Sequence, residues 1–451
     1  MTPPGHESSL RSSRSELIQK GLALASLTGR TVTISQACED TGISAVTAKK
    51  LFDSDADFVI ALKRELIHHF SNTVAAPSSA NLETNVRELL FSYIDFATGA
   101  PVYFNAMSNL FLAPPDFMER NSLDIHPLII LTREIVKREA PDASDWLRTT
   151  RTLALFFSIH GCAHLCTVGI LRHLREGARN RYLDSAVTHV IGGISDSLET
   201  GCGLTMEPRE FAGIINFPVI PPARFFPRST PAEAEMALFR GAVEEVATVG
   251  ADRLSVEGAA ARADLSLSVA RRFLDTDISF AKQVENHLDA LSTQVLESHM
   301  ASVPKGQPFI SYGKANALGY IKCALMDPLG FEVYIELSSG SIVPSTFESC
   351  DGVFEMGDAF SLLVDLVRQC IVEGDGPQDT LVLYDSTLSL WSYAHGIAHG
   401  IACGPFRNLP WQEKLKYLGP LVDISIGSLI HRLDLDIRGV EMKPIQDLRA
   451  E

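Results

Sequence analysis

The chain has 451 residues, of which 46% are hydrophobic, and a formal net charge of −16. The length predicts several domains with sizeable cores, and the acidic balance excludes a general nucleic-acid coat protein but not a regulator with a locally basic surface. The sequence has no apolar run long enough to span a bilayer, no signal-peptide-like start and eight scattered cysteines, which together predict a cytoplasmic protein with reduced thiols and no membrane partner.

The first predicted element follows a tail that is rich in Ser and Pro. The tail is expected to be disordered to about residue 12. A helix is then expected from about Ser15 to Leu27, and its apolar side would be formed by Leu17, Ile18, Leu22 and Ala25. Arg14, at the start of this helix, could reach a phosphate or a minor groove, although a solvated side chain is the plainer interpretation.

A helix-turn-helix pattern lies between Thr33 and Phe52, in the stretch TISQACEDTGISAVTAKKLF. Thr33 can cap a short helix, Gly42 permits the positive φ of a tight turn, and Ser44 can cap a second helix from Ala45 to Leu51. Such a pair is often a plain helical corner, but its second helix can also enter a DNA major groove. The DNA-binding candidates of this first head are Arg14, Thr33, Ser44, Ala45, Thr47, Lys49 and Lys50.

Residues 81 to 199 are expected to form only helices and short loops, after a connecting helix from about Ser54 to Phe70. Aromatic side chains in this block are spaced like one helical face and its neighbour. Such a stripe is usually plain core, but it can also line an apolar ligand cavity. The ligand-binding candidates here are Tyr93, Phe96, Phe104, Met107, Phe111, Phe156 and His160.

A second head follows a Pro-rich linker over residues 204 to 232. The stretch from Ser255 to Leu274, SVEGAAARADLSLSVARRFL, repeats the helix-turn-helix pattern that begins at Thr33. Asp264 stands where Gly42 stood, which is tolerable because Asp visits the left-handed region more readily than most residues. The DNA-binding candidates of this head are Ser255, Ser266, Leu267, Ser268, Arg271 and Arg272.

The duplication continues past the heads. Tyr93, Ala97 and Pro101 recur, with the same spacing between them, as Tyr320, Ala324 and Pro328. The segment from His160 to His164, HGCAH, recurs as HGIAH from His395 to His399. The long interval between the matching residues indicates duplicated domains rather than the short repeats of a solenoid. The second-copy ligand candidates are therefore Tyr320, Phe331, Trp391 and His395.

These motifs together resemble the TetR family of transcriptional regulators, and the resemblance covers nearly the whole chain twice. It implies an all-α fold in which each unit has a helix-turn-helix head, at 13–72 and 233–298, and a helical ligand-binding domain, at 81–203 and 306–440. The family works as a homodimer, so the resemblance implies an intramolecular pseudo-dimer that is a monomer in solution. The helices 144–171 and 182–198 would pair with 379–403 and 410–433 to form its four-helix interface.

Two departures from the family pattern affect the expected DNA contacts. The aromatic residue usual in the middle of the recognition helix is Lys49 in one head and Arg271 in the other, and the lysine usual at the start of the fourth helix is Asp55 or Asp277. Residues 11–72 carry eight basic and seven acidic side chains, whereas residues 229–292 carry six basic and eleven acidic ones. Because phosphate contacts supply most non-specific affinity, the second head should bind DNA more weakly.

The sequence contains no nucleophile elbow, P-loop or metalloprotease motif, which favours a protein that is not an enzyme. His160/His164 and His395/His399 are i, i+4 pairs, but zinc needs at least a third protein ligand. Cys162 points elsewhere on its helix, and the second copy has Ile397 at that position. The sequence therefore favours buried histidines that pack or bind a ligand, with no metal and no cofactor.

The interpretation that follows is a TetR-like regulator, most simply a repressor, that binds double-stranded operator DNA with an asymmetric sequence. A small apolar effector would release it. The alternative is a TetR-like ligand sensor or protein-binding module whose heads have lost DNA binding. Paired basic residues in both recognition helices favour the first interpretation, and the replaced phosphate-binding residues favour the second.

Overall fold

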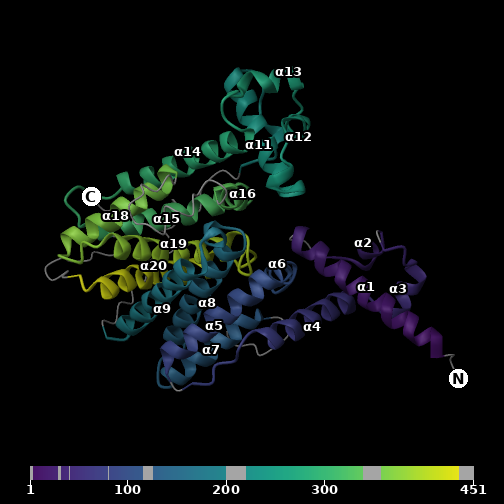
Figure 1. Cartoon of the computed structure of the whole chain (residues 1–451), viewed down its shortest axis with the longest axis horizontal. Coiled ribbons are helices and arrows are strands. Elements are labelled where there is room, and N and C mark those ends of the chain that lie inside the picture. Colours follow the sequence, from purple (N-terminus) through teal and green to yellow (C-terminus); the bar gives the residue numbers. More distant parts are fainter. Residues whose placement is uncertain are drawn as a thin grey trace. The chain divides into compact units, whose positions relative to one another are not determined.

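The fold is taken from a computed structural model of the chain. It describes residues 4–28, 32–39, 41–79, 81–114, 125–199, 220–338 and 357–435. Every regular element in these ranges is a helix, as the sequence predicts, and no strand occurs among them (Figure 1). None of the helices within these ranges is both long and apolar enough to cross a lipid bilayer.

The two copies of the repeat have the same order of long helices, as the sequence predicts. The first copy is α1 (Pro4–Thr28), α2 (Ile34–Cys38), α3 (Ala45–Leu51), α4 (Asp55–Thr73), α5 (Leu82–Gly99), α6 (Pro101–Leu110), α7 (Pro127–Glu139), α8 (Asp145–Thr167), η1 (Ile170–His173) and α9 (Glu176–Glu199). The second copy is η2 (Ala223–Phe225), α11 (Pro231–Val249), η3 (Ala251–Arg253), α12 (Val256–Arg262), α13 (Leu267–Ala270), η4 (Arg271–Phe273), α14 (Phe280–Ala301), α15 (Phe309–Met326), α16 (Pro328–Ser338), α18 (Asp358–Glu373), α19 (Thr380–Ala402) and α20 (Trp411–Leu433).

The N-terminal prediction is wrong in one respect. Helix α1 begins at Pro4, so the expected disordered tail is helical over most of its length. Proline is well suited to the first turn of a helix because the N–H it lacks would have no partner there. Neither Gly nor Pro interrupts residues 6–14, so nothing in the sequence ends the helix.

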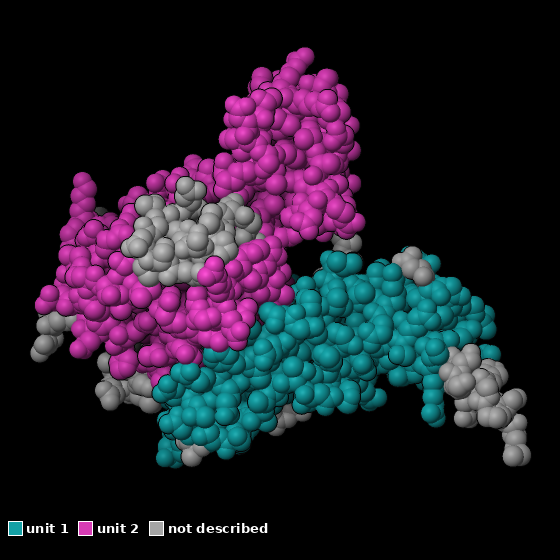
Figure 2. Space-filling model, in the orientation of Figure 1, with its two compact units in different colours: residues 1–156, 404–410 teal, residues 157–403, 411–451 magenta. Residues whose placement is uncertain are grey.

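The compact units do not coincide with the repeats. Unit 1 comprises residues 1–156 and 404–410, and unit 2 comprises residues 157–403 and 411–451 (Figure 2). The boundary falls inside α8, so the end of α8 and all of α9 belong to the same unit as the second repeat. The predicted domain boundaries follow the duplication of the sequence, whereas the compact units follow the packing of the helices.

Unit 1 contains the first head and most of the first helical domain. The head packs around Leu17, Leu22, Ala37 and Phe58, which are all fully buried. Gly21 of α1 allows this packing without a shift of its neighbours, because a Cβ there would lie 2.7 Å from Phe58 Cζ and 2.9 Å from Leu62 Cδ2. The four residues predicted to line the inner side of helix one are all buried, as expected: Leu17, Ile18, Leu22 and Ala25.

Unit 2 contains a seam between helices of the two repeats. Helix α9 packs along α20 and α19, and the end of α8 crosses α19. The crossing is close because Gly161 of α8 lies against Gly396 of α19, and a Cβ on Gly161 would stand 2.8 Å from the Gly396 nitrogen. Within unit 2, α9 and the end of α8 thus pack on helices of the second repeat.

The predicted linker is only partly described, since residues 204–219 lie outside the described ranges. From Ile220 the chain runs through η2 to Thr230, which caps α11 in a capping box with Glu233. The Ala223 N–H donates to Glu244 Oε1 at 2.7 Å, and Ala223 is fully buried. This last part of the linker thus packs on the first helix of the second head.

Candidate functional site

The first head contains a helix-turn-helix in which the local sequence fixes both helices. Thr33 and Gln36 form a capping box at the start of α2. Gly42 has φ +69° in the turn, as its position in the pattern requires. Ser44 accepts a hydrogen bond from the Thr47 N–H at 3.1 Å and caps α3. The predicted pair of helices is confirmed.

Helix α3 presents its polar side to solvent. Ala48 is buried beneath it, whereas Ala45, Lys49 and Lys50 are exposed and Thr47 is half-buried. Val46, which the sequence analysis did not select, is 68% exposed on the same helix. This face could contact a duplex through two ammonium groups, a hydroxyl and an apolar side chain.

Arg14 and Asp55 have structural partners within the first head. The Arg14 guanidinium lies over the Phe52 ring, 5.2 Å from its centroid, which is a cation–π contact. Asp55 Oδ1 accepts the Ile34 N–H at 2.8 Å and so caps the first turn of α2. Asp55 therefore stabilises the head itself.

The second head keeps the same caps but has a shorter recognition helix. Ser255 accepts the Gly258 N–H at 3.0 Å, and Ser266 accepts the Val269 N–H at 3.4 Å. Asp264 has φ +53°, which confirms that it replaces Gly42 in the turn. The α-helix that begins at Leu267 ends at Ala270, and the chain continues as the 3-10 turn η4.

The two arginines of the second head are exposed at this 3-10 turn. Arg271 Nη2 lies 3.2 Å from Glu257 Oε1 on α12, and both side chains are more than half exposed. Arg272 is exposed beside it, and Ser268 is exposed while Leu267 is half-buried. The ion pair sets an acidic side chain next to one of the two expected phosphate contacts.

A cavity lies inside unit 2, in the second helical domain. Its volume, measured as the space that the centre of a water-sized sphere can occupy, is about 40 Å³. Since one water needs on the order of 10–15 Å³ by this measure, the cavity holds a few waters or a small apolar group. Of the predicted ligand residues, Tyr320 and Trp391 line it, together with Tyr334, Phe360, Leu363 and Leu390 among others.

The aromatic stripe of the first domain packs on itself in unit 1. Tyr93 stacks on Phe96 at 6.0 Å and meets the edge of Phe104 at 5.7 Å between ring centroids. Met107, Phe111 and Phe156 are fully buried as well. These contacts are those of a hydrophobic core, which was the plainer interpretation of the stripe.

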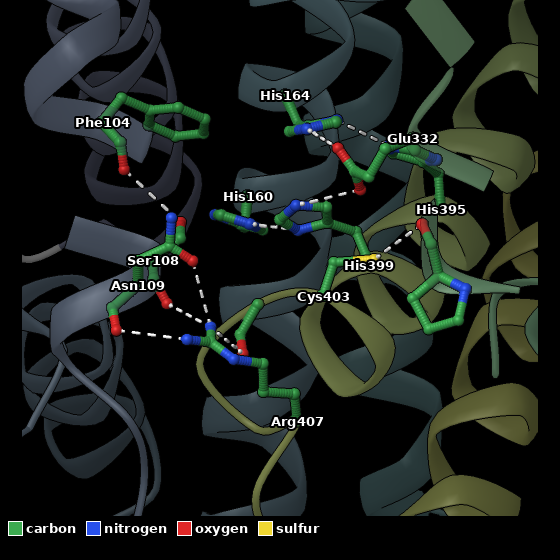
Figure 3. A network of polar contacts seen from close by, with 12 residues as sticks. Phe104, Ser108, Asn109, His160, His164, Glu332, His395, His399, Cys403 and Arg407 are labelled. Atoms are coloured by element: carbon green, nitrogen blue, oxygen red, sulfur yellow. Dashed lines mark hydrogen bonds and ion pairs between the residues drawn. The ribbon is translucent and has the colours of Figure 1, made fainter. Parts of the chain in front are cut away.

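Four histidines meet in the seam of unit 2 (Figure 3). His160 Nε2 lies 2.9 Å from His399 Nδ1, and His395 Nε2 lies 2.9 Å from His164 Nδ1. His160 and His395 are equivalent in the two repeats, as are His164 and His399, so the two hydrogen bonds are copies of one another. Such an exchange of equivalent contacts is the geometry of a two-fold interface.

The histidine network extends to the cavity and to one carboxylate. Tyr320, which lines the cavity, lies with its hydroxyl 3.0 Å from His395 Nδ1. Phe331 stacks on the His395 ring at 5.3 Å. Burial, and then the neighbouring His164 and His160, lower the pKa of His395 well below its usual range, so its ring is neutral. Glu332 of α16 lies 3.4 Å from both His164 and His399.

Glu332 is a candidate functional residue that no motif in the sequence indicated. It follows Phe331 directly in an otherwise strongly apolar stretch of α16, and Asn105 follows the equivalent Phe104 in the first repeat. The sequence signal for a functional role was the acidic side chain itself, because it stands in an apolar helix and its equivalent in the other repeat is neutral. Spacing along the chain gave no indication that it approaches the histidines.

Comparison with known proteins gives no family for the chain. Neither a protein-family model nor any curated protein sequence matches it.

Proposed function

We propose that the protein is a transcriptional regulator of TetR type in which both halves of the usual dimer are joined in one chain. The single observation that carries this proposal is the duplicated helix-turn-helix, each copy capped at both helices and followed by the same series of long helices. A capped, exposed second helix of this kind is the element that enters a major groove.

The first head would contribute more of the affinity for DNA than the second head. Lys49 and Lys50 stand exposed in the last turn of α3, where they can neutralise phosphates. The exposed Val46 offers an apolar contact of the kind that a thymine methyl group accepts. In the second head, Arg271 is already paired with Glu257, and the surrounding residues 229–292 are acidic on balance.

The effector would be a small apolar molecule bound in the second helical domain. Support comes from the cavity, whose lining is mostly apolar and aromatic. A ligand there would lie against Tyr320, whose hydroxyl contacts His395 in the seam between the repeats. A shift of Tyr320 would thus reach the helices that join the two copies.

The test is DNA binding measured by fluorescence anisotropy over a salt series, first with a mixed-sequence duplex at low salt and then with fragments captured genome-wide. Lys49→Ala plus Lys50→Ala should weaken binding on all sequences and reduce the slope of log affinity against log salt by about two, one for each phosphate that is no longer neutralised. Arg271→Ala plus Arg272→Ala should cost less affinity and should relax sequence preference at one half-site, because arginine reads guanine with two donors.

A matched control is Lys137→Ala plus Lys305→Ala, which removes two exposed lysines outside the heads and should leave the slope unchanged. Equal losses in the control and the head variants would mean that only the overall charge matters. Absence of binding at low salt would contradict the proposal.

A second candidate function is a ligand sensor or protein-binding module of the same architecture that no longer binds DNA. Two observations favour it: Asp55 caps α2 where the family has a phosphate-contacting lysine, and Glu257 engages Arg271. Normal folding together with no DNA binding by the intact protein in the salt series would select this function.

A further inference from the structure

The centre of the histidine network has the composition of a metal site. Two imidazole nitrogens and one carboxylate converge there: Nε2 of His164, Nε2 of His399 and the oxygens of Glu332. All three residues place a possible ligand atom within 4.8 Å of one another. The His164 and His399 side chains are 4% and 7% exposed, so little water competes for these atoms.

The distances fit an ion better than they fit direct hydrogen bonds. Each histidine Nε2 stands 3.4 Å from a Glu332 oxygen, beyond the range of about 2.7–2.9 Å for a charge-assisted hydrogen bond. Two ligands at about 2.0–2.1 Å from a tetrahedral zinc ion are about 3.3–3.4 Å apart. Glu332 Oε1 is sealed from solvent and accepts no hydrogen bond from the residues that the structure describes.

The outer histidines hold the inner ones in the orientation that a metal requires. A ligating Nε2 must offer its lone pair, so the proton of that ring sits on Nδ1. His164 Nδ1 can then donate to His395 Nε2, and His399 Nδ1 can donate to His160 Nε2, both at 2.9 Å. His395 in turn can donate from Nδ1 to the Tyr320 hydroxyl. Partners of this kind fix tautomer and ring orientation in metal sites.

We propose that His164, His399 and Glu332 bind one divalent transition-metal ion, best matched by Zn²⁺, in the seam where the two repeats meet. Three protein ligands leave a fourth position for water or a small ligand, and the 34% exposed Glu332 side chain marks the side from which the ion enters. The ion joins α8 of the first repeat to α16 and α19 of the second, so it fastens the two copies together. This inference does not depend on DNA binding.

The full chain is stripped with a chelator, dialysed and titrated with Zn²⁺ by calorimetry, and the bound metal is counted by mass spectrometry. We expect one Zn²⁺ per chain and a rise in the thermal midpoint when it binds, because the ion stabilises the folded state. Replacement by Co²⁺ should give the intense visible absorption of a tetrahedral site. Glu332→Gln, which keeps the shape of the side chain, should lower the affinity at least 100-fold, and His399→Ala should do the same.

His160→Ala and His395→Ala, which remove only the orienting partners, should lower the affinity by about 10–100-fold. The matched control is Glu336→Gln, one turn further along α16, where the carboxylate accepts the Ala251 N–H instead and zinc affinity should be unchanged. Circular dichroism identifies any histidine variant that fails to fold, and Glu332→Gln then decides. Weak binding of several ions, no binding, or tight binding that survives Glu332→Gln would overturn the proposal.

Discussion

At the scale of single residues, two buried histidines make the stability of the fold depend on pH. Burial lowers the pKa of His189 on α9 to about 3, with a smaller contribution from the charge of Arg432. His126, at the start of α7, has its pKa lowered to about 3 by burial alone. In the unfolded chain each ring would titrate near pH 6.5. The native state therefore holds both rings neutral in a range where the unfolded chain takes up protons.

The first prediction at this scale concerns His189. Because its folded pKa is depressed, its contribution to stability is full above about pH 6.5 and is lost as the pH falls toward 3. Between pH 6.5 and pH 5 one such group costs about 2 kcal/mol of the free energy of unfolding. His189→Leu should remove about that much of the pH dependence, as measured by urea unfolding at several pH values. The matched control is His68→Gln, on an exposed histidine; an equal effect of both variants would contradict the assignment.

Pairs of helices show how the same signals give unequal elements. Helices α3 and α13 both begin after a serine cap and a residue with positive φ, yet α3 has 7 residues and α13 has 4. Glycines also allow close helix contacts in both heads. Gly21 lets α4 approach α1, and its repeat partner Gly241 lets α12 approach α11.

The crossing of α8 and α19 gives the prediction at this scale. A Cβ on Gly161 would collide with the carbonyl oxygen of Ser392. Because this oxygen belongs to the backbone of α19, no change of side-chain rotamer can relieve the collision. Gly161→Ala should therefore destabilise the protein by about 1–3 kcal/mol through overpacking. The matched control is Gly427→Ala on α20, where a Cβ meets nothing within 4 Å. It should be neutral or stabilise by up to about 1 kcal/mol, since alanine favours the helix. Chemical unfolding followed by circular dichroism measures both, and equal effects would argue against a close crossing.

At the scale of the whole molecule, the seam uses equivalent surfaces of both repeats inside one chain. The end of α8 and all of α9 pack on α19 and α20, and the equivalent histidine pairs exchange hydrogen bonds. A homodimer would need the same surfaces from a second chain. Since these surfaces already pack on one another within unit 2, we expect the seam to be closed to a second chain.

The prediction at this scale is the mass in solution. Light scattering should report about 49.2 kDa, the mass of one chain, over a hundredfold range of protein concentration. A dimer of twice that mass at micromolar concentration would mean that another surface mediates assembly or that the seam opens to a second chain. DNA added in the same experiment should bind one chain per duplex.

The sequence by itself determined the helices and the duplication, because caps, turn residues and apolar spacing act locally. Thr33, Ser44 and Asp264 took the predicted roles since each depends only on neighbours close in the chain. Only the tertiary structure decided which residues from distant parts of the chain meet, because that depends on long-range packing. It brought Glu332 to His164 and His399 from a different helix, and it divided the compact units inside α8 rather than between the repeats. In the proposed metal site, His164 comes from the first repeat and both other ligands, Glu332 and His399, come from the second, so spacing along the chain does not bring the three together.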